Sequence, residues 1–549
     1  FTRRLMEWVH EEGFCDEATR DKDWIDYGTM LYDGREPISE YERIKGLLHD
    51  FFATKTKAEL YEATFTRRLL IAPVTTMEEL VASPHFAARD FWHDADAGAF
   101  GTVRTAGAFA KFSASPLPNN PLATPLDAHC DAPWATPRRS APPPVPAGPP
   151  RRGRPLEGLK IADFMWVFAG PFCSRNLADL GATVVRVESS RRLDTLRTAG
   201  NFQDDRIDPD WAVQFTNVNA GKRSIALDLS TEAGREVALD LVRWADVTME
   251  SFTPKAMAGF GLDYESLRRH RPDLIMTSSC LMGHYGPESS LAGFGTMAAA
   301  VSGWFHVTGW PDRLPCGPFS AYTDYVSPRF LLLAVLAAVE HRRRTGEGQY
   351  VDLSQAEASL GFMGEAVLDF TVNGRIAERH GNDDDVLAPH GTYRAAGDDQ
   401  WVAIAVTGDG PWRALCDLVG RADLAALDAG QRRERRRELD AVIEAWTAVR
   451  PPAEVAEVLV ARGIAAHGVQ NTVEAWNDPQ LRHRDHFCQV PHAVMGQTWV
   501  EGSRLRLART PPAAGSPPAL GEHNWEVLTE VLGYSEDRAA ELAGSGLFD

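Results

Sequence analysis

From residue 156 onward, short apolar runs alternate with longer segments in which hydrophobic positions recur every three to four residues. The short runs have the length of buried β-strands, and the longer segments have the period of amphipathic helices. Strands are predicted at 159–164, 184–187, 247–250, 274–278 and 350–353, and helices at 171–180, 230–244 and 327–344. Strands that alternate with helices favour a parallel sheet covered on both faces, which is the α/β class.

A chain of 549 residues is too long for one compact core, so we expect more than one domain. A further strand at 401–406, followed by several helical segments, predicts a smaller α+β domain at about 395–485. The large domain is then expected at about 156–375 together with the C-terminal segment.

A segment rich in proline, residues 115–155, separates this α/β region from the first part of the chain. Proline fixes φ and removes a backbone donor, so this segment is predicted to be an extended, semi-rigid linker. The chain opens at Phe1, without Met, inside a predicted amphipathic helix. From this we expect an N-terminally truncated sequence.

Residues on the two sides of the linker repeat at a constant spacing of 395 positions. The repeated pairs include Pro84 and Pro479, Arg89 and Arg484, Gly107 and Gly502, and Pro116 and Pro511. A gapless register over more than forty residues predicts tandem related domains. We therefore expect residues 1–114 to be the closing third of a first copy, and residues 156–549 to be a complete second copy.

Composition narrows the class of partner. A formal net charge of −19 argues against a nucleic-acid partner, because such proteins usually present a basic face. No run reaches the ~20 apolar residues that span a bilayer, so no membrane partner is expected. The start carries no secretory signal. Seven cysteines are scattered without C-x-x-C pairs, which favours a reduced, cytoplasmic protein without disulfides or a zinc site.

An ordered set of motifs resembles the family III CoA-transferases, the CaiB/BaiF family of formyl-CoA transferase and carnitine CoA-transferase type. In the second copy the matching runs are 156–163, Ala169–Gly170–Pro171, 177–182, 187–188, 219–228, 245–252, 344–349 and 520–523. Each motif alone is weak, but their order over 156–549 is specific. Fragments of residues 1–130 match the family's closing third.

The resemblance implies a fold, a reaction and a nucleophile. The implied fold has a Rossmann-like large domain and a smaller domain, with two chains threaded as interlocked rings. The implied reaction moves CoA from an acyl-CoA donor to a small carboxylic acid, with the thioester as substrate and no further cofactor. The family's nucleophile is an aspartate ahead of a long helix, which corresponds to Asp324. Without the resemblance, an acidic residue at this place is more often a helix cap or a first-turn residue.

A carboxylate nucleophile divides one acyl exchange into easier covalent steps through an aspartyl-CoA thioester. The site must then exclude water, which would hydrolyse the intermediate. Because Asp324 must be ionised, we expect backbone N–H groups beside it.

For CoA itself the resemblance implies contacts at the ends of strands, where open α/β sheets bind ligands. These residues are Phe168, Ala169, Ser189, Leu227, Asp228, Leu229, Ser230, Ser251 and Phe252. Some family members carry arginine where this chain has Ser189, so Arg191 or Arg192 is the hypothetical phosphate ligand here. Ser251, Gly259 and Pro328 also depart from common family residues.

Two other functions stay open. An α-methylacyl-CoA racemase-like isomerase needs a histidine opposite the aspartate, but the corresponding run is 292–297, which has none; His284 and His306 lie nearby in sequence. The first copy lacks every nucleophile motif and is a candidate non-catalytic partner. The tandem arrangement is expected to give a homodimer or an intrachain pseudo-dimer.

Two acidic or histidine-rich runs are not expected to bind metal. Asp383–Asp385 lacks the spacing of a calcium loop. His483 and His486 have no third ligand nearby in sequence.

Overall fold

The computed structural model describes residues 1–118, 153–319 and 321–548. The chain divides into two compact units. The large unit contains residues 1–306, 317–377 and 486–549, and the small unit contains residues 307–316 and 378–485. The predicted linker at 115–155 falls mostly on residues 119–152, which lie outside the described residues.

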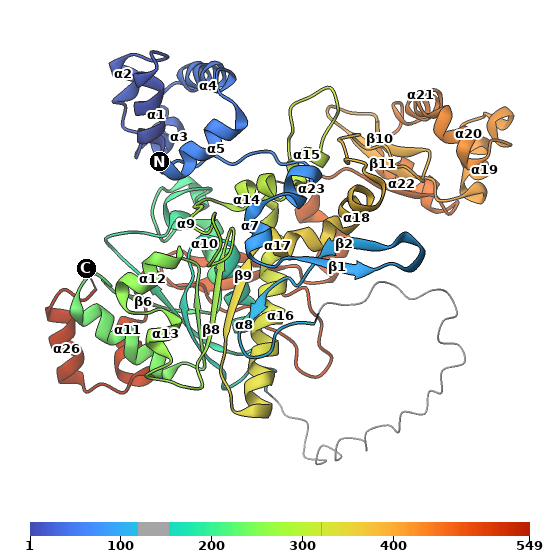
Figure 1. Cartoon of the computed structure of the whole chain (residues 1–549). Coiled ribbons are helices and arrows are strands. Elements are labelled where there is room, and N and C mark those ends of the chain that lie inside the picture. The colour runs from blue at the N-terminus through green and yellow to red at the C-terminus, as the bar shows by residue number, and fades with distance from the viewer. Residues whose placement is uncertain (119–152, 320, 549) are drawn as a thin grey trace. The chain divides into compact units, whose positions relative to one another are not determined.

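The large unit is built on a seven-stranded sheet in the order β3-β9-β8-β7-β4-β5-β6 (Figure 1). Its strands are β3 (Lys111–Phe112), β4 (Lys160–Phe164), β5 (Thr183–Glu188), β6 (Arg223–Ala226), β7 (Val247–Glu250), β8 (Ile275–Cys280) and β9 (Tyr350–Ser354). Strands β4 to β9 run parallel, and β3 is antiparallel at the edge. The chain adds β5 and β6 on one side of β4, then β7, β8 and β9 on the other. This is the doubly wound Rossmann order, so the predicted fold is confirmed.

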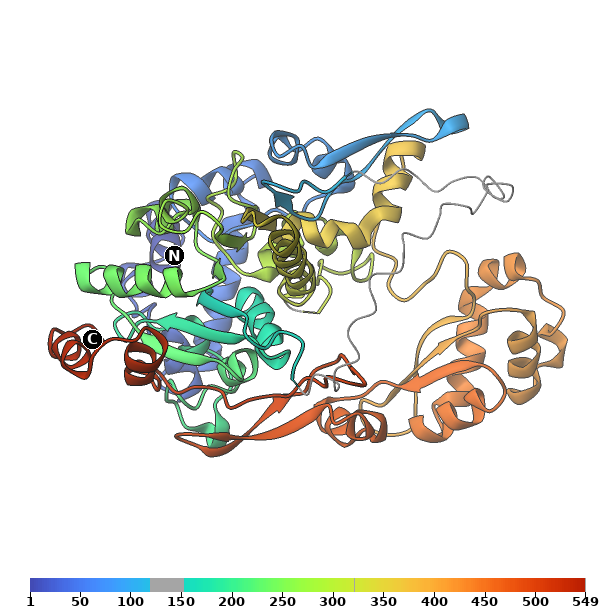
Figure 2. The ribbon, with the colours of Figure 1, turned by 90° about the horizontal axis from the view of Figure 1, so that it is seen from below.

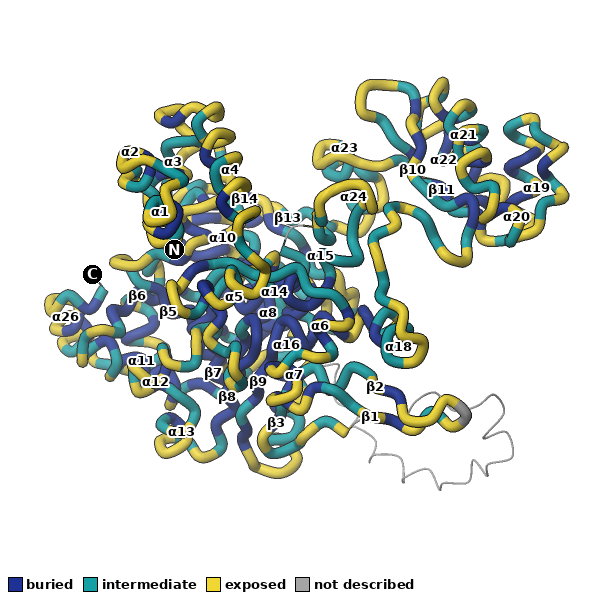
Figure 3. Tube along the Cα trace, turned by 45° about the horizontal axis from the view of Figure 1, so that its top comes forward, coloured by how far each residue is buried: buried dark blue, intermediate teal, exposed yellow. Residues whose placement is uncertain are grey.

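Helices cover both faces of this sheet, as Figure 1 shows. The helices of residues 153–377 and 486–548 are α8 (Ala169–Asp179), α9 (Thr195–Thr198), α10 (Val213–Asn219), α11 (Glu232–Trp244), α12 (Pro254–Phe260), α13 (Tyr264–Leu267), α14 (Gly295–Val301), α15 (Trp304–Val307), α16 (Tyr322–Thr345), α17 (Gln355–Leu360), α18 (Gly364–Asn373), α25 (Asn524–Glu526) and α26 (Glu536–Gly544). On one face, Leu241 of α11 and Leu542 of α26 pack against Val185 and Ile225. On the other, Leu177 of α8 and Val335 of α16 pack in the core that holds Val184 and Val351, so the buried dark blue residues concentrate on the sheet and these helices (Figure 3).

Helix α16 begins at Tyr322, five residues before the predicted start at 327. A helix that began at residue 327 would have Pro328 in its first turn, where proline is favourable. The structure instead has Pro328 inside the helix, where it cannot donate the usual bond to the carbonyl of Asp324. Among the described residues, α16 alone has the length and hydropathy of a membrane span; half of its apolar window is buried inside the protein.

The first part of the chain forms helices, a hairpin and the edge strand β3. The elements are α1 (Thr2–Glu11), α2 (Glu17–Arg20), α3 (Tyr27–Tyr32), α4 (Ile38–Ala53), α5 (Lys57–Thr66), α6 (Met77–Val81), α7 (Pro84–Ala88), β1 (Trp92–Asp96) and β2 (Thr102–Ala106). Helices α1, α4 and α5 share a core that includes Met6, Val9 and Phe51. β3 pairs with β9, so residues before the linker complete the sheet built after it.

The small unit has a three-stranded antiparallel sheet with helices packed on it. Its elements are β10 (His390–Arg394), β11 (Trp401–Ala405), α19 (Asp409–Leu418), α20 (Ala429–Glu434), α21 (Arg436–Thr447), α22 (Pro452–Val460), β12 (Ala465–Gly468), α23 (Thr472–Asn477) and α24 (Pro479–His483). Val402, Trp412, Leu415 and Ile443 lie in its core. A last hairpin, β13 (Phe487–His492) and β14 (Gly496–Glu501), returns the chain to the large unit.

Segments 395 residues apart form the same elements. α7 and α24 begin and end at equivalent positions, and β1–β2 corresponds to β13–β14. Asp90 and Asp485, also 395 apart, both adopt the left-handed conformation, with φ of 48° and 50°. Figure 2 shows the two hairpins, blue and orange-red, well apart from each other.

Candidate active site

Asp324 lies in the first turn of α16 and is 6% exposed. A carboxylate at this position is stabilised by the helix dipole. Its own backbone N–H donates to the carbonyl of Ala321 at 2.9 Å, which begins the helix. The side chain is thereby fixed at the amino end of a helix that packs on the sheet.

Three residues hold the Asp324 region, and none of them was predicted to contact the carboxylate. The Gly295 N–H donates to Oδ2 of Asp324 at 3.1 Å, which supplies one of the expected backbone donors. The Gln355 side chain lies near the carboxylate and acts to lower its pKa. The Gln355 Oε1 lies 3.0 Å from Oγ1 of Thr323, which also lies 3.0 Å from the carbonyl of Gly295. Thr323, Gly295 and Gln355 therefore form one buried network around the carboxylate.

Gly295 must be glycine because of its closeness to the carboxylate. A Cβ added there would lie 2.6 Å from Oδ2 of Asp324, and from its Cγ as well. Backbone therefore fills the place beside Asp324, in the run where a racemase-like enzyme needs a histidine. His284 instead pairs with the buried Glu250 at 3.1 Å. Burial acts to lower the pKa of His284, but hydrogen bonds with Cys280 and Glu250 outweigh it and raise the pKa to about 11.

Burial raises the pKa of Asp324 to about 6, against the opposing hydrogen bonds from Gly295 and Gln355. A carboxylate with this pKa is mostly ionised at neutral pH and is more basic than an ordinary aspartate. Both properties suit a nucleophile that must attack and later be released.

Aromatic rings surround the neighbouring residue, Tyr325. The ring of Phe168 lies 4.8 Å from that of Tyr325, and the ring of Phe319 lies 5.5 Å away on a different element. Phe168 precedes α8 and also contacts Phe172 at 5.8 Å. The structure thus brings one predicted CoA residue, Phe168, beside the turn that carries Asp324.

The loop after β4 is held in a strained conformation at the point where the strand order reverses. Val167 has a φ of 65°, which is unfavourable for a β-branched residue. Its N–H donates to both carboxylate oxygens of the buried Asp194, at 3.2 and 3.0 Å. Asp194 is in turn paired with the buried Arg186. Strain that is over-determined in this way is common where backbone is positioned for a ligand.

The loop after β7 contacts the loop after β4. Ser251 Oγ accepts from the Trp166 N–H at 2.9 Å, so it joins the loops that follow β4 and β7. The Phe252 ring lies 5.7 Å from that of Trp166. The Phe252 N–H donates to Glu250 at 2.8 Å. Ala169 is buried in the first turn of α8.

The remaining predicted CoA residues follow β5 and β6. Asp228 accepts from the N–H and hydroxyl of Ser230 at 2.9 and 2.6 Å. Ser189 Oγ accepts from the Arg192 N–H at 3.3 Å. Arg191 forms an ion pair with Asp228 at 3.0 Å, so in this structure the hypothetical phosphate ligand is engaged with a carboxylate. Leu227 is buried in the core, whereas Leu229 is partly buried against it.

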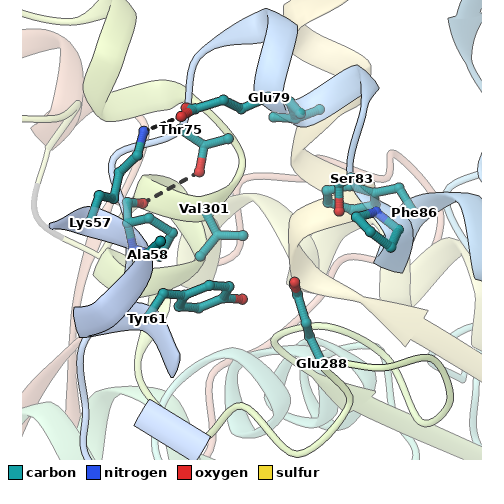
Figure 4. A pocket seen from close by; sticks show the side chains of 12 residues that line it. Lys57, Ala58, Tyr61, Thr75, Glu79, Ser83, Phe86, Glu288 and Val301 are labelled. Carbon is teal, nitrogen blue, oxygen red and sulfur yellow. Dashed lines mark hydrogen bonds and ion pairs between the residues drawn. The ribbon is translucent and has the colours of Figure 1, made fainter. Parts of the chain in front are cut away.

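A cavity of about 220 Å³ lies elsewhere, between α5, α6 and α7 and the side chains of Glu288 and Val301 (Figure 4). Lys57 pairs with Glu79 at one end, and the Tyr61 hydroxyl and Glu288 carboxyl face each other across it. Burial raises the pKa of both Tyr61 and Glu288. None of the predicted site residues lines this cavity, so it is not the candidate active site.

No group of three or more His, Cys, Asp or Glu side chains suited to a metal occurs among the described residues. The polar clusters described above are ion pairs and hydrogen-bond networks. What the Asp324 region offers is a buried carboxylate, a backbone donor and an aromatic surround.

Comparison with known proteins gives a consistent result. The family model described as CoA-transferase family III matches residues 9–129 and 156–524. The succinyl-CoA:mesaconate CoA-transferase of Haloarcula marismortui is 36% identical over 386 residues, covering 68% of this chain and 96% of the relative. The succinyl-CoA–D-citramalate CoA-transferase of Chloroflexus aurantiacus is 32% identical over 71% of this chain and 98% of its own. The crystal structure of a CaiB/BaiF family protein from Brucella suis has a TM-score of 0.64 and 30% identity, over 69% of this chain and all of that one.

Proposed function

The chain belongs to CoA-transferase family III, and we propose that its second copy moves CoA from an acyl-CoA to a carboxylic acid with Asp324 as the nucleophile. The activity follows from the family match and from relatives named for this reaction. The single observation that supports Asp324 is its geometry: a buried carboxylate on a helix amino end, held by Gly295 and Gln355.

The reaction proceeds in balanced steps at this carboxylate. Asp324 attacks the thioester carbonyl, CoA leaves as the thiolate, and a mixed anhydride forms. The thiolate attacks the aspartyl carbonyl, which releases the donor acid and leaves an aspartyl-CoA thioester. The acceptor carboxylate attacks that thioester, and the departing thiolate then attacks the acceptor's carbonyl in the new anhydride. The products are the acceptor acyl-CoA and free Asp324.

The Gly295 N–H and the Gln355 side chain have defined roles in these steps. Both stabilise the ionised Asp324 before attack, and both favour its departure as a leaving carboxylate. Phe168 and Tyr325 limit the access of water to the intermediate, whose hydrolysis would lose the thioester. No metal or bound cofactor is required by these steps, because the CoA thioester is itself the substrate.

The names of the relatives suggest a substrate class. Both name succinyl-CoA as donor and a dicarboxylic acid, mesaconate or D-citramalate, as acceptor. We therefore propose succinyl-CoA as the donor and a small dicarboxylic acid as the acceptor. CoA is proposed to bind along the ends of β4, β5, β6 and β7, over the residues described above.

The first copy is proposed to be a structural part of the same enzyme. In support, the family model matches separately on each side of the linker, and equivalent segments form equivalent elements. β3 and α7 occupy the edge of the second copy's sheet, which favours intrachain pairing over an interlocked homodimer through that edge. A cytoplasmic location remains a prediction, supported by the free thiols of the six described cysteines.

The experiment that tests the nucleophile is CoA exchange between labelled acyl-CoA and free acid. Asp324→Asn removes the attacking carboxylate at nearly constant volume and should lower the exchange rate by at least about 10³-fold. Asp417→Asn, at an exposed position of α19, is the matched control and should leave the rate unchanged. Exchange at the wild-type rate in Asp324→Asn would refute the assignment.

A further inference from the structure

Arg89, at the end of α7 in the first copy, is fully buried against residues of the second copy. Its guanidinium makes a bidentate pair with Glu357, with N–O distances of 2.6 and 2.9 Å. The third nitrogen donates to Asp352 at 2.8 Å and to the carbonyl of Tyr285 at 3.2 Å. Every side of this cation is therefore engaged by residues more than 190 positions later in sequence.

The second copy is shaped to receive this side chain. A Cβ on Gly283 would lie 2.2 Å from the guanidinium, and Gly283 has a φ of 80°, so only glycine fits there. The Tyr285 ring covers the guanidinium at 4.4 Å. These contacts form the socket of Arg89 and suit a planar guanidinium that binds a carboxylate through two nitrogens. The ammonium of a lysine would not make the same contacts.

The charges in this socket depend on Arg89. Burial acts against the charge of Arg89, but Glu357 and Asp352 outweigh it and raise its pKa. Burial also raises the pKa of Glu357, against the opposing bonds from Arg89. Loss of Arg89 would leave two buried carboxylates without a cation, and α17 could not keep its position.

Helix α17 links this socket to the candidate nucleophile. It begins at Gln355, and Ser354 caps it by accepting from the Glu357 N–H at 3.3 Å. Gln355 and Glu357 are two residues apart, about 200° around the helix, so they face opposite sides. Glu357 faces Arg89, whereas Gln355 faces Thr323 and Asp324. One turn of helix therefore lies between the first-copy arginine and the second-copy carboxylate.

We propose that Arg89 is a positioning residue for Asp324, which makes the first copy a working part of the second copy's active site. The proposal rests on the proposed function, in which Asp324 is the nucleophile. Arg89 fixes α17 through Glu357, and α17 presents Gln355 to the carboxylate. The same arginine of the other copy, Arg484, is exposed in this structure and has no comparable socket.

The consequence is specific to the reacting group. If α17 shifts, the contact of Gln355 with Thr323 is lost, and Gln355 no longer lowers the pKa of Asp324 against the effect of burial. The pKa of Asp324 then rises further above its usual range. Less of the carboxylate is ionised near neutral pH, and the carboxylate that remains is misplaced.

Two variants and one control test the proposal in the full chain. Arg89→Lys keeps the charge and loses the bidentate pair; Glu357→Gln keeps the shape and loses the charge. Each should lower kcat at least about tenfold, since small misplacements of reacting groups cost up to about 10²-fold, with KM for succinyl-CoA changed less than about threefold. In both, the acid limb of the kcat profile should move to higher pH. Arg484→Lys should stay within about twofold of wild type in kcat.

A purely structural role would give a different result. If kcat per folded molecule and the acid limb stay at wild-type values in both variants, with thermal unfolding used to count the folded fraction, the proposal is wrong. Trapping of CoA on Asp324 in the wild-type protein tests the proposed function separately. If CoA is trapped there but both variants behave like wild type, the role of Arg89 is refuted and the role of Asp324 stands.

Discussion

The two repeated segments, residues 76–116 and 471–511, have the same local structure and different surroundings. Both contain a capped helix, a second helix that starts with proline, a left-handed aspartate and a hairpin. Arg89 of the first segment is fully buried, whereas Arg484 of the second is exposed. The hairpins differ as well: residue 104 on β2 lies against α18, with Thr371 bonded to its carbonyl, whereas β14 meets α10 through Asn217.

This comparison shows that local sequence determines the secondary structure of a segment, whereas docking determines which of its side chains are buried. Capping residues and turn residues recur at both places, and so do the elements that they specify. Burial of the arginine requires a sheet edge and the socket around Glu357, which only the first segment meets. The two segments therefore differ in where they dock, while their local structure is the same.

The largest difference in stability between the two segments should appear when the arginine of each is replaced. Arg89→Met leaves Glu357 and Asp352 buried without a cation and should destabilise the large unit by about 3–5 kcal/mol. Arg484→Met is an exposed change and should cost less than about 0.5 kcal/mol. Urea unfolding followed by tryptophan fluorescence measures both. An equal loss of unfolding free energy in the two variants would show that Arg89 and Arg484 do not differ in their surroundings.

The next effect concerns pH and His85, whose equivalent in the other segment is Gln480. His85 Nε2 lies 2.8 Å from the carbonyl of Met282, and Nδ1 accepts from the Glu288 N–H at 3.1 Å. Burial lowers the pKa of His85 to about 4, so the folded state holds it neutral. The unfolded state has a pKa near 6.5 and takes up a proton first.

Stability from this group is therefore complete above about pH 6.5 and is lost as pH falls toward 4, by up to about 1.4 kcal/mol per pH unit. His85→Gln keeps a hydrogen-bond donor and an acceptor but cannot take up a proton in this pH range. The difference in thermal stability between wild type and His85→Gln should shrink or reverse between pH 7 and pH 5. A constant difference over that range would mean that His85 is not buried as the structure has it.

The smallest effect should be the same in both segments. Thr76 and Asn471 each cap a helix in a capping box with Glu79 or Glu474. Thr76→Ala and Asn471→Ala should each cost about 1 kcal/mol, because the lost bond is local in both places. Hydrogen exchange of the amides of Glu79 and Glu474 reports each cap separately. Unequal protection losses would show that docking, rather than local sequence, holds these caps.

Most of the fold followed from the sequence because its signals are local. The strand predicted at 247–250 is β7 with the same bounds, and the helix predicted at 230–244 is α11 with Thr231 as its cap. The start of α16 was wrong because Pro328 mimics a first-turn proline. Its true start depends on tertiary packing, which outweighs the cost of an internal proline.

The candidate site could be predicted only in part. The resemblance pointed to Asp324 and to Phe168, Ser251 and Phe252 at the ends of strands, and these assignments stay predictions. Gln355 carried a weak signal, as a polar residue two positions after the strand predicted at 350–353. Gly295 lay in the run 292–297 and Arg89 in the 395-residue repeat, but neither was assigned a role in the site. One acts through its backbone, and the other through a contact 268 residues away in sequence.

The central claim is that Asp324 becomes covalently loaded with CoA during turnover. The most direct measurement is incubation with acyl-CoA donor alone, trapping with hydroxylamine or borohydride, and mass analysis of the peptide that contains residue 324. We predict modification of Asp324, which disappears in Asp324→Asn. Modification of another residue, or CoA exchange that proceeds with no trapped peptide, would contradict the account.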